Sequence, residues 1–284
     1  MKNNKTMSII YMLISMISTQ FSASIAKQLI IELDALTVTI FRIFFAALIS
    51  FILFKTWRVF PTLKLISRKN LIFYTLSLGV MNTLFYYSLG KLPQGIAVGL
   101  EFTGPLLLAL VSIKNKKDYI WVSFAIIGIF LMVPWSEVLK FNFSFIGAIC
   151  ALSAGFCWAL YIYYGQKVAT ENLGIHALSL ALCFSSLFLL PIGFINNPEA
   201  LLRPSFWVQG LIIAIFAAAF PYTLDILALK NLSKVSYGTL SSLAPILAAL
   251  SGLVFLKEYL SIYQWIALVF IMIASVGITL REIK

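Results

Sequence analysis

A single acidic residue, Glu101, lies inside the apolar stretch Gly95–Leu110, which reads GIAVGLEFTGPLLLAL. A carboxylate there can bind a cation, such as the ammonium group of a substrate, or take up and release a proton. Ionisable residues inside apolar spans usually face the bundle interior or a water-filled cavity. The alternative role is structural: an ion pair with Arg42, which lies within another apolar stretch. We therefore expect Glu101 to line a cavity. Its role is either to bind substrate or a proton, or to form a structural ion pair with Arg42.

Other polar and aromatic residues recur inside apolar stretches, and some share a helix face. Asn82 and Tyr86 are spaced i, i+4, and Tyr222 and Asp225 are spaced i, i+3, so each pair lies on one side of a helix. Each residue alone could equally form a helix–helix hydrogen bond, and Asp225 could equally lie at the membrane interface. Together they predict the walls of a polar cavity. The predicted substrate-binding residues are Glu101, Asn82, Tyr86, Gln20, Trp158, Tyr161, Tyr222, Asp225 and Ser241.

Two prolines, Pro105 and Pro245, also lie within apolar stretches. Each lacks an N–H for the helix ladder and frees a carbonyl one turn earlier. Such breaks are tolerated where neighbouring groups or a water-filled cavity satisfy the backbone. We predict a structural or gating role for both prolines and for Arg42, as hinges or as simple kinks.

The composition indicates that membrane-spanning helices position these residues. The chain is 61% hydrophobic and 11% charged, whereas a soluble domain is about half apolar and about a quarter charged. A spanning helix needs about 20 mostly apolar residues. We predict an all-α polytopic membrane protein with spans at 8–26, 36–54, 71–89, 94–112, 119–135, 145–165, 177–195, 207–229, 236–256 and 262–280.

The net charge of +11 follows membrane topology rather than a nucleic-acid surface, because the basic residues occupy short gaps between spans and form no basic stripe. With the amino terminus inside, fifteen of the 21 Lys and Arg residues fall on the inner side, five fall in outer loops, Lys27 among them, and Arg42 stays within a span. The positive-inside rule then predicts cytoplasmic termini. We expect a multi-pass protein of the cell inner membrane with no nucleic-acid partner.

An internal repeat appears when the chain is shifted by 140 residues. Residues 86–110 then align with 226–250 without a gap, and Pro105 aligns with Pro245. Each repeat holds five spans, and an odd number makes the halves enter the membrane from opposite sides. Inverted repeats are typical of secondary transporters, whose substrate site lies at the repeat interface near mid-membrane. We predict one five-helix repeat over 1–140 and a second, inverted one over 141–284, around a central cavity.

Several of these stretches resemble a known family. FYTLSLGVMNTLFYYSL (73–89) followed by GIAVGLEFTGPLLLAL, then GFCWALYIYYGQK (155–167), FPYTLDILAL (220–229) and SYGTLSSLAPILAALSGLVFLKEYL (236–260), are similar to bacterial threonine/homoserine exporters of the EamA branch of the drug/metabolite transporter superfamily. The resemblance implies efflux of a small metabolite through a ten-helix inverted repeat. It departs from the family pattern at Ala244, where many relatives have Glu, at Lys257, where Gly is usual, and at Asp225, where Glu is usual.

These observations together predict an exporter of small neutral amino acids, such as threonine or homoserine, that works by alternating access and could be coupled to protons. Neither a cofactor nor a metal is predicted, and the oligomeric state is left open. Within transport, the alternatives are an aromatic amino acid, a purine or a cationic drug. A membrane enzyme or receptor is a remote alternative, because His176 is the only histidine and no H-E-x-x-H or G-x-S-x-G motif is present.

Overall fold

The computed structural model describes residues 2–65, 67–111, 119–135, 143–168, 175–221, 224, 228 and 240–281. In that part of the chain every regular element is a helix, as the composition predicted. The helices are α1 (Lys2–Glu32), α2 (Ala35–Leu53), η1 (Thr56–Leu65), α3 (Arg68–Leu89), α4 (Gln94–Glu101), α5 (Thr103–Val111), α6 (Tyr119–Met132), α8 (Phe145–Val168), α9 (Ile175–Asn196), α10 (Pro198–Leu202), α11 (Pro204–Ala214), η4 (Ile215–Ala219), α14 (Ala244–Leu256) and α15 (Ile262–Arg281).

Several helices are suited to a bilayer. By length and composition α1, α2, α8 and α9 could each cross a membrane, and shorter apolar helices occupy Gln94–Leu108, Ile120–Met132, Pro204–Ala217, Ala244–Leu256 and Ile262–Gly277. On α8 the exposed side chains include Ile149, Leu152 and Phe156, which recur every three or four residues. An apolar stripe turned outward is what lipid contact requires, because a soluble protein would bury it. The chain is a multi-pass membrane protein.

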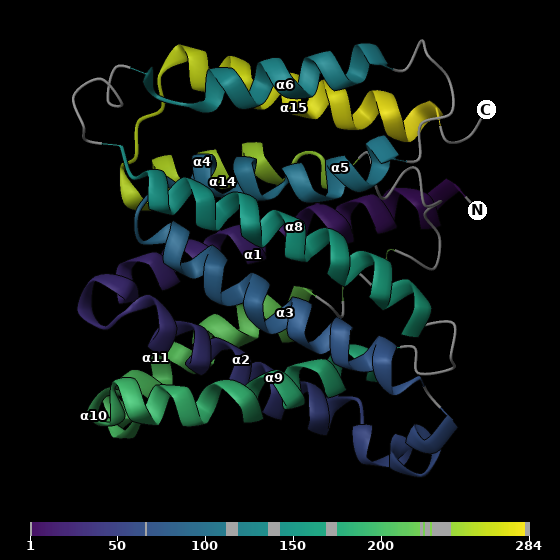
Figure 1. The fold of residues 1–284 in the computed structure, drawn as a ribbon, viewed down its shortest axis with the longest axis vertical. Helices are drawn as coiled ribbons and strands as arrows, with labels where there is room; N and C mark the ends of the chain where they lie inside the picture. The colour runs from purple at the N-terminus through teal and green to yellow at the C-terminus, as the bar shows by residue number, and fades with distance from the viewer. Residues whose placement is uncertain are drawn as a thin grey trace.

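The long helices lie side by side with their axes roughly parallel (Figure 1). Both chain termini are at one end of the bundle, called here the terminal end, and the opposite end is called the far end. The helices α6 and α15 pack together on one side, and α2, α9 and α11 lie on the opposite side. Between these groups, α3 packs on α8, α4 on α14, and α1 on both α11 and α14.

Two helices are interrupted near the prolines singled out above. Phe102 lies in a turn between α4 and α5, and Ser242 and Leu243 form a turn directly before α14. Phe102 and Ser242 are 140 residues apart, the same offset as the internal repeat. The cause is local: proline cannot donate to the carbonyl four residues earlier, which belongs to Glu101 in one case and Ser241 in the other.

The backbone at the first interruption touches α8 through two glycines. A Cβ atom added to Gly104 would lie 1.7 Å from the carbonyl oxygen of Gly155, and one added to Gly155 would lie 2.5 Å from the carbonyl oxygen of Glu101. Glycine at both positions therefore allows a contact that any larger residue would prevent. Because the Glu101 carbonyl rests against α8, this contact fixes the position of Glu101.

The turn after α14 contains a strained residue. Lys257 has a φ of 55°, in the left-handed region, and the Glu258 amide after it donates to the Gly252 carbonyl at 3.1 Å. This conformation costs a residue with a Cβ atom about 1–2 kcal/mol and costs glycine little. The departure noted at Lys257 thus falls where the backbone itself favours glycine.

We expect Lys257→Gly to stabilise the fold by about 1 kcal/mol, since relief of the left-handed strain is only partly offset by the extra freedom of glycine in the unfolded chain. The melting temperature of the purified protein in detergent measures this. Lys91→Gly is the matched control, because Lys91 is an exposed lysine in another far-end turn and has no positive φ. A melting temperature for Lys257→Gly that is equal to or lower than that of the wild-type protein would contradict the prediction.

Candidate functional site

Three polar residues lie at the same depth in neighbouring helices. Arg42 is seven residues after the start of α2, Asn82 is seven residues before the end of α3, and Glu101 is seven residues after the start of α4. These helix ends meet at the far end (Figure 1), so the three residues lie about 10 Å inside it at a rise of 1.5 Å per residue. Residues far apart in the sequence thus come to one level of the bundle.

Arg42 is held by the face of α3 that the sequence singled out. Its Nη1 donates to the Oδ1 of Asn82, whose Nδ2 in turn donates to the Leu78 carbonyl at 2.8 Å. The guanidinium also lies 5.4 Å from the ring centroid of Tyr86, within the range of a cation–π contact. Asn82 and Tyr86 therefore position an arginine. Both the oxygen and the nitrogen of the Asn82 amide already form hydrogen bonds.

Glu101 is only 9% exposed, and its side chain makes no hydrogen bond to another described residue. Arg42 is close enough to act on its carboxylate electrostatically. The pairing considered above is nevertheless not formed, because among the described residues the single ion pair within 4.0 Å joins Lys27 and Glu258. The Nε of Arg42 is also buried without a hydrogen-bond partner. Two opposite charges therefore face the same region without neutralising each other by direct contact.

The predicted aromatic residues are divided between this region and the helix packing. Trp158 is half-buried, and its ring meets that of Phe102, the residue after Glu101, edge to face at 6.0 Å between centroids. Tyr161 lies about one turn further along α8 and stacks on Tyr74 at 4.7 Å. Trp158 thus contacts the residue that follows Glu101, whereas Tyr161 packs in the core between α3 and α8.

The remaining predicted residues are in other places. Ser241 is half-buried next to the turn before α14, and Tyr222 and Asp225 lie outside the described residues. Gln20, although buried, is not brought to Arg42. Its carbonyl accepts hydrogen bonds from Gln94 at 2.9 Å and from Ser251 at 3.1 Å, so it joins α1, α4 and α14.

A second polar group, called here the far-end network, continues from Gln20. Ser24 donates to the Oε1 of Gln94 at 2.7 Å, and the backbone amide of Gln94 donates to Glu258 at 2.6 Å. Lys27 pairs with Glu258 at 2.5 Å and also donates to the Leu92 carbonyl. Sequence reasoning missed this network, although opposite charges next to the ends of two spans were a visible signal.

The far-end network also corrects one span boundary. The prediction ended the first span at residue 26 and placed Lys27 in an outer loop, but α1 continues to Glu32. The side chain of Lys27 is 16% exposed. A buried ammonium is tolerated there because a carboxylate and a carbonyl satisfy it, and therefore the helix need not end before it.

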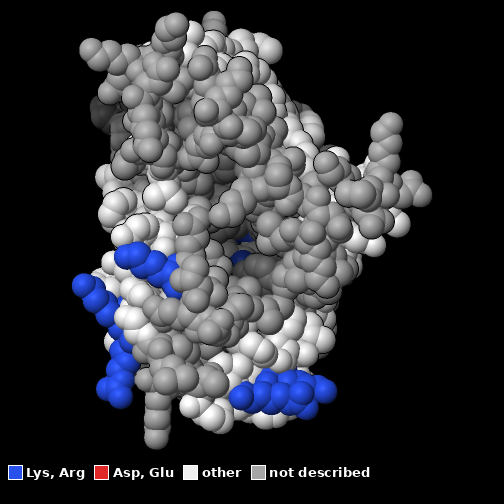
Figure 2. Space-filling view, turned by 90° about the vertical axis from the view of Figure 1, so that its right-hand side faces the viewer, with Lys and Arg blue, Asp and Glu red and all other residues white. Residues whose placement is uncertain are grey.

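Figure 2 views the terminal end, where Lys and Arg side chains lie along the lower part of the face and a few Lys or Arg atoms are visible deeper, near its centre.

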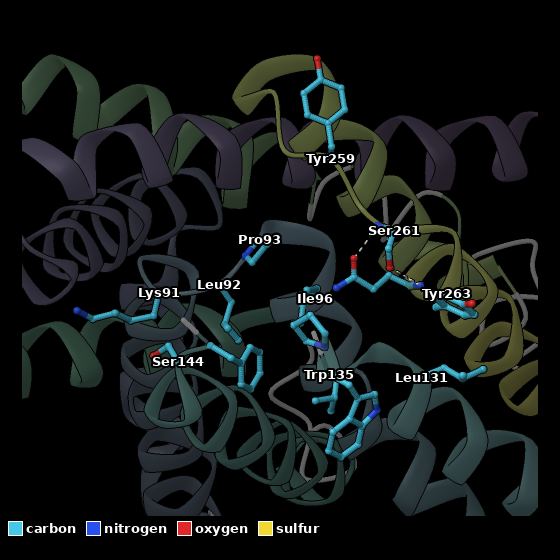
Figure 3. A pocket seen from close by; sticks show the side chains of 14 residues that line it. Lys91, Leu92, Pro93, Ile96, Leu131, Trp135, Ser144, Tyr259, Ser261 and Tyr263 are labelled. Carbon is cyan, nitrogen blue, oxygen red and sulfur yellow. Dashed lines mark hydrogen bonds between the residues drawn. The ribbon is translucent and has the colours of Figure 1, made fainter. Parts of the chain in front are cut away.

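A pocket of about 760 Å³ opens between the connections at the far end. Its lining includes Lys91, Leu92, Ile96, Trp135 and Tyr259, none of which the sequence singled out. Figure 3 shows Lys91 and Tyr259 extending away from the other side chains. The remaining lining is largely apolar, so this pocket does not offer the paired charges found around Arg42 and Glu101. It was not predicted because three separate connections build it.

Known proteins similar to this chain cover nearly all of it. The threonine/homoserine exporter RhtA of Salmonella typhimurium (strain LT2) is 41% identical over 272 residues, which are 96% of this chain and 91% of that protein. RhtA of Escherichia coli (strain K12) is 40% identical over 276 residues, 97% of this chain and 92% of that protein. The profile of the EamA-like transporter family matches residues 145–280.

The chain belongs to the EamA-like transporter family. This EamA-like protein is a transporter and not an enzyme. Its fold is also similar to a protein solved by crystallography, with a TM-score of 0.61, 16% sequence identity and 99% of each chain covered. The resemblance drawn from the sequence motifs is therefore confirmed at the level of the family.

Proposed function

We propose that this EamA-like transporter exports small neutral amino acids, such as threonine or homoserine, from the cytoplasm across the cell inner membrane. The observation that carries the proposal is the identity of 40–41% to threonine/homoserine exporters over nearly the whole chain. The opposite charges of Arg42 and Glu101 support it, because a neutral amino acid carries one charge of each sign.

We further propose that ten spanning helices form two inverted repeats, 1–140 and 141–284, around a central cavity. The helix contacts support this architecture. Exchanging the first five spans for the last five preserves several of the main helix contacts: α2–α9, α4–α14 and α6–α15 map onto themselves, α3–α8 maps onto α1–α11, α3–α9 onto α2–α11, and α4–α8 onto α1–α14. The contact of α2 with α3 has no comparable counterpart between α9 and α11 in the described residues. The two helix breaks, at Phe102 and Ser242, obey the same exchange.

Transport by alternating access follows from such a pair of repeats, because each half can adopt the shape of the other in turn. The hydrogen-bonded far-end network supports a conformation that is closed at the far end and open toward the terminal end. With cytoplasmic termini, this is the conformation that loads substrate from the cell. Glu101 would bind the substrate ammonium or exchange a proton with it, and Tyr86 and Trp158 would border it.

Metabolite profiling of the culture medium tests the substrate. Overexpression in a host lacking its own exporters should raise extracellular threonine or homoserine, and deletion in the native host should lower them. A rise in an aromatic amino acid, a purine or a cationic drug, with threonine and homoserine unchanged, would instead assign one of the alternative substrates. Cells that carry the vector without the gene control for leakage.

A further inference from the structure

The buried side chain of Glu101 and the half-buried side chain of Arg42 lie inside this transporter without a direct counter-charge. Arg42 bonds to a neutral amide and lies against an aromatic ring, and its Nε has no partner. The side chain of Glu101 forms no hydrogen bond or ion pair with another described residue. Charged groups inside a membrane protein are costly unless paired, and the two residues nevertheless stay apart at the same depth of the bundle. Their separation would be explained if a third component paired with both.

We propose that Arg42 binds the α-carboxylate of the substrate while Glu101 binds its ammonium group. This proposal rests on the proposed amino-acid export and deepens it, because it names the side chain that binds each charged group of the substrate. An α-amino acid carries both charges on groups attached to one carbon, so a single molecule bound between the two side chains satisfies both. The guanidinium N–H groups that do not bond to Asn82 suit a carboxylate, which accepts paired hydrogen bonds from arginine.

Asn82 and Tyr86 act as positioning residues in this arrangement. Asn82 is anchored to the Leu78 carbonyl at 2.8 Å and accepts one N–H of Arg42, while the Tyr86 ring, 2% exposed, supports the guanidinium from one side. These contacts restrict the rotamers of a long flexible side chain, so less entropy is lost when the substrate binds. Asn82 therefore acts on the carboxylate through Arg42 and does not bind it directly.

The arrangement selects a class of substrate. A molecule with an ammonium group alone, such as a cationic drug, would leave Arg42 unpaired, and a purine offers neither charge. Each uncompensated buried charge disfavours binding. Zwitterionic α-amino acids therefore remain as the substrates that neutralise the site, whichever side chain they carry.

Binding of L-threonine and of L-threoninamide to the purified protein tests the proposal, since the amide keeps the ammonium and hydroxyl groups but lacks the carboxylate. Wild-type protein should bind threonine about 10- to 100-fold more tightly than the amide, as expected for a charged hydrogen-bonded pair. In Arg42→Gln this ratio should fall close to one, mainly through weaker threonine binding. Arg42→Lys, which keeps the charge but not the planar fork, should show an intermediate ratio.

Arg203→Gln is the matched control, because Arg203 also lies over an aromatic ring, that of Phe206 at 5.9 Å, but is exposed in a connection at the far end; its ratio should stay at the wild-type value. If wild-type protein bound threonine and threoninamide about equally, the role of Arg42 would be overturned, and this test does not depend on whether any variant folds. A high ratio retained in folded Arg42→Gln would do the same while leaving amino-acid export intact. Wild-type protein that bound neither threonine nor homoserine would overturn the proposed function, and this proposal with it.

Discussion

Replacing Glu101 by Gln should lower the export of threonine by at least about 10-fold, because a neutral amide cannot neutralise the substrate ammonium and a charged hydrogen bond is worth about 1.5–3 kcal/mol. Glutamine has nearly the same shape, so packing around the buried side chain is preserved. The removal of the carboxylate also leaves Arg42 without the opposite charge that acts on it. Efflux of labelled threonine from loaded proteoliposomes measures the effect.

Glu199→Gln is the appropriate comparison, since it removes a carboxylate that is exposed in the first turn of α10. It should export threonine at the wild-type rate. Gel filtration of both variants at equal concentration shows that each is folded. Unchanged efflux by folded Glu101→Gln would remove Glu101 from the mechanism and leave it a structural role only.

The second large effect is expected at the contact between α5 and α8. In Gly104→Ala the new Cβ atom would meet the Gly155 carbonyl oxygen at 1.7 Å. The main chain fixes the positions of both atoms, so the two helices must move apart. Overpacking of this kind costs about 1–3 kcal/mol or more, which outweighs the gain of about 1 kcal/mol in helix propensity from Gly to Ala. The melting temperature should fall, and export should be lost because the helix break next to Glu101 shifts.

Gly79→Ala separates this contact from a general effect of alanine. The nearest atom to a Cβ at Gly79 is the side-chain Oγ of Ser185 at 3.2 Å, so only a small shift is needed, which the hydrogen bond of this hydroxyl to the Thr75 carbonyl at 3.0 Å can absorb. This variant should keep a melting temperature close to that of the wild type. If Gly104→Ala melted at the same temperature as Gly79→Ala, the close packing of α5 on α8 would not limit stability.

The all-helical membrane class and the family could be predicted from the sequence alone, because both depend on features that are local or that repeat along the chain. Long apolar runs define helices, and the prolines that interrupt them are visible residue by residue. The 40–41% identity to the exporters spreads over nearly the whole chain, so the motifs that suggested the family are spread over it as well. Span ends were less certain: the first helix passes through Lys27 to Glu32 because a partner from a distant turn satisfies the charge.

The partners of the candidate site residues could not be read from the chain. Helical spacing placed Asn82 and Tyr86 on one face of α3. It did not indicate that this face contacts Arg42 of α2. It placed Gln20 among the substrate-binding residues with Glu101, although Gln20 belongs to the far-end network. Helix packing decides which residues of different helices become neighbours, and it depends on side chains that are remote in sequence.

The sequence by itself determined that this chain forms apolar helices, which of their residues are polar, and which family it belongs to, because periodicity and composition act within each helix. Only the tertiary structure decided that Arg42 and Glu101 lie at one depth without pairing, and that Lys27 and Glu258 do pair. The physical reason is that the energy of a buried charge depends on its neighbours in space, and these neighbours are brought together by the way the helices pack.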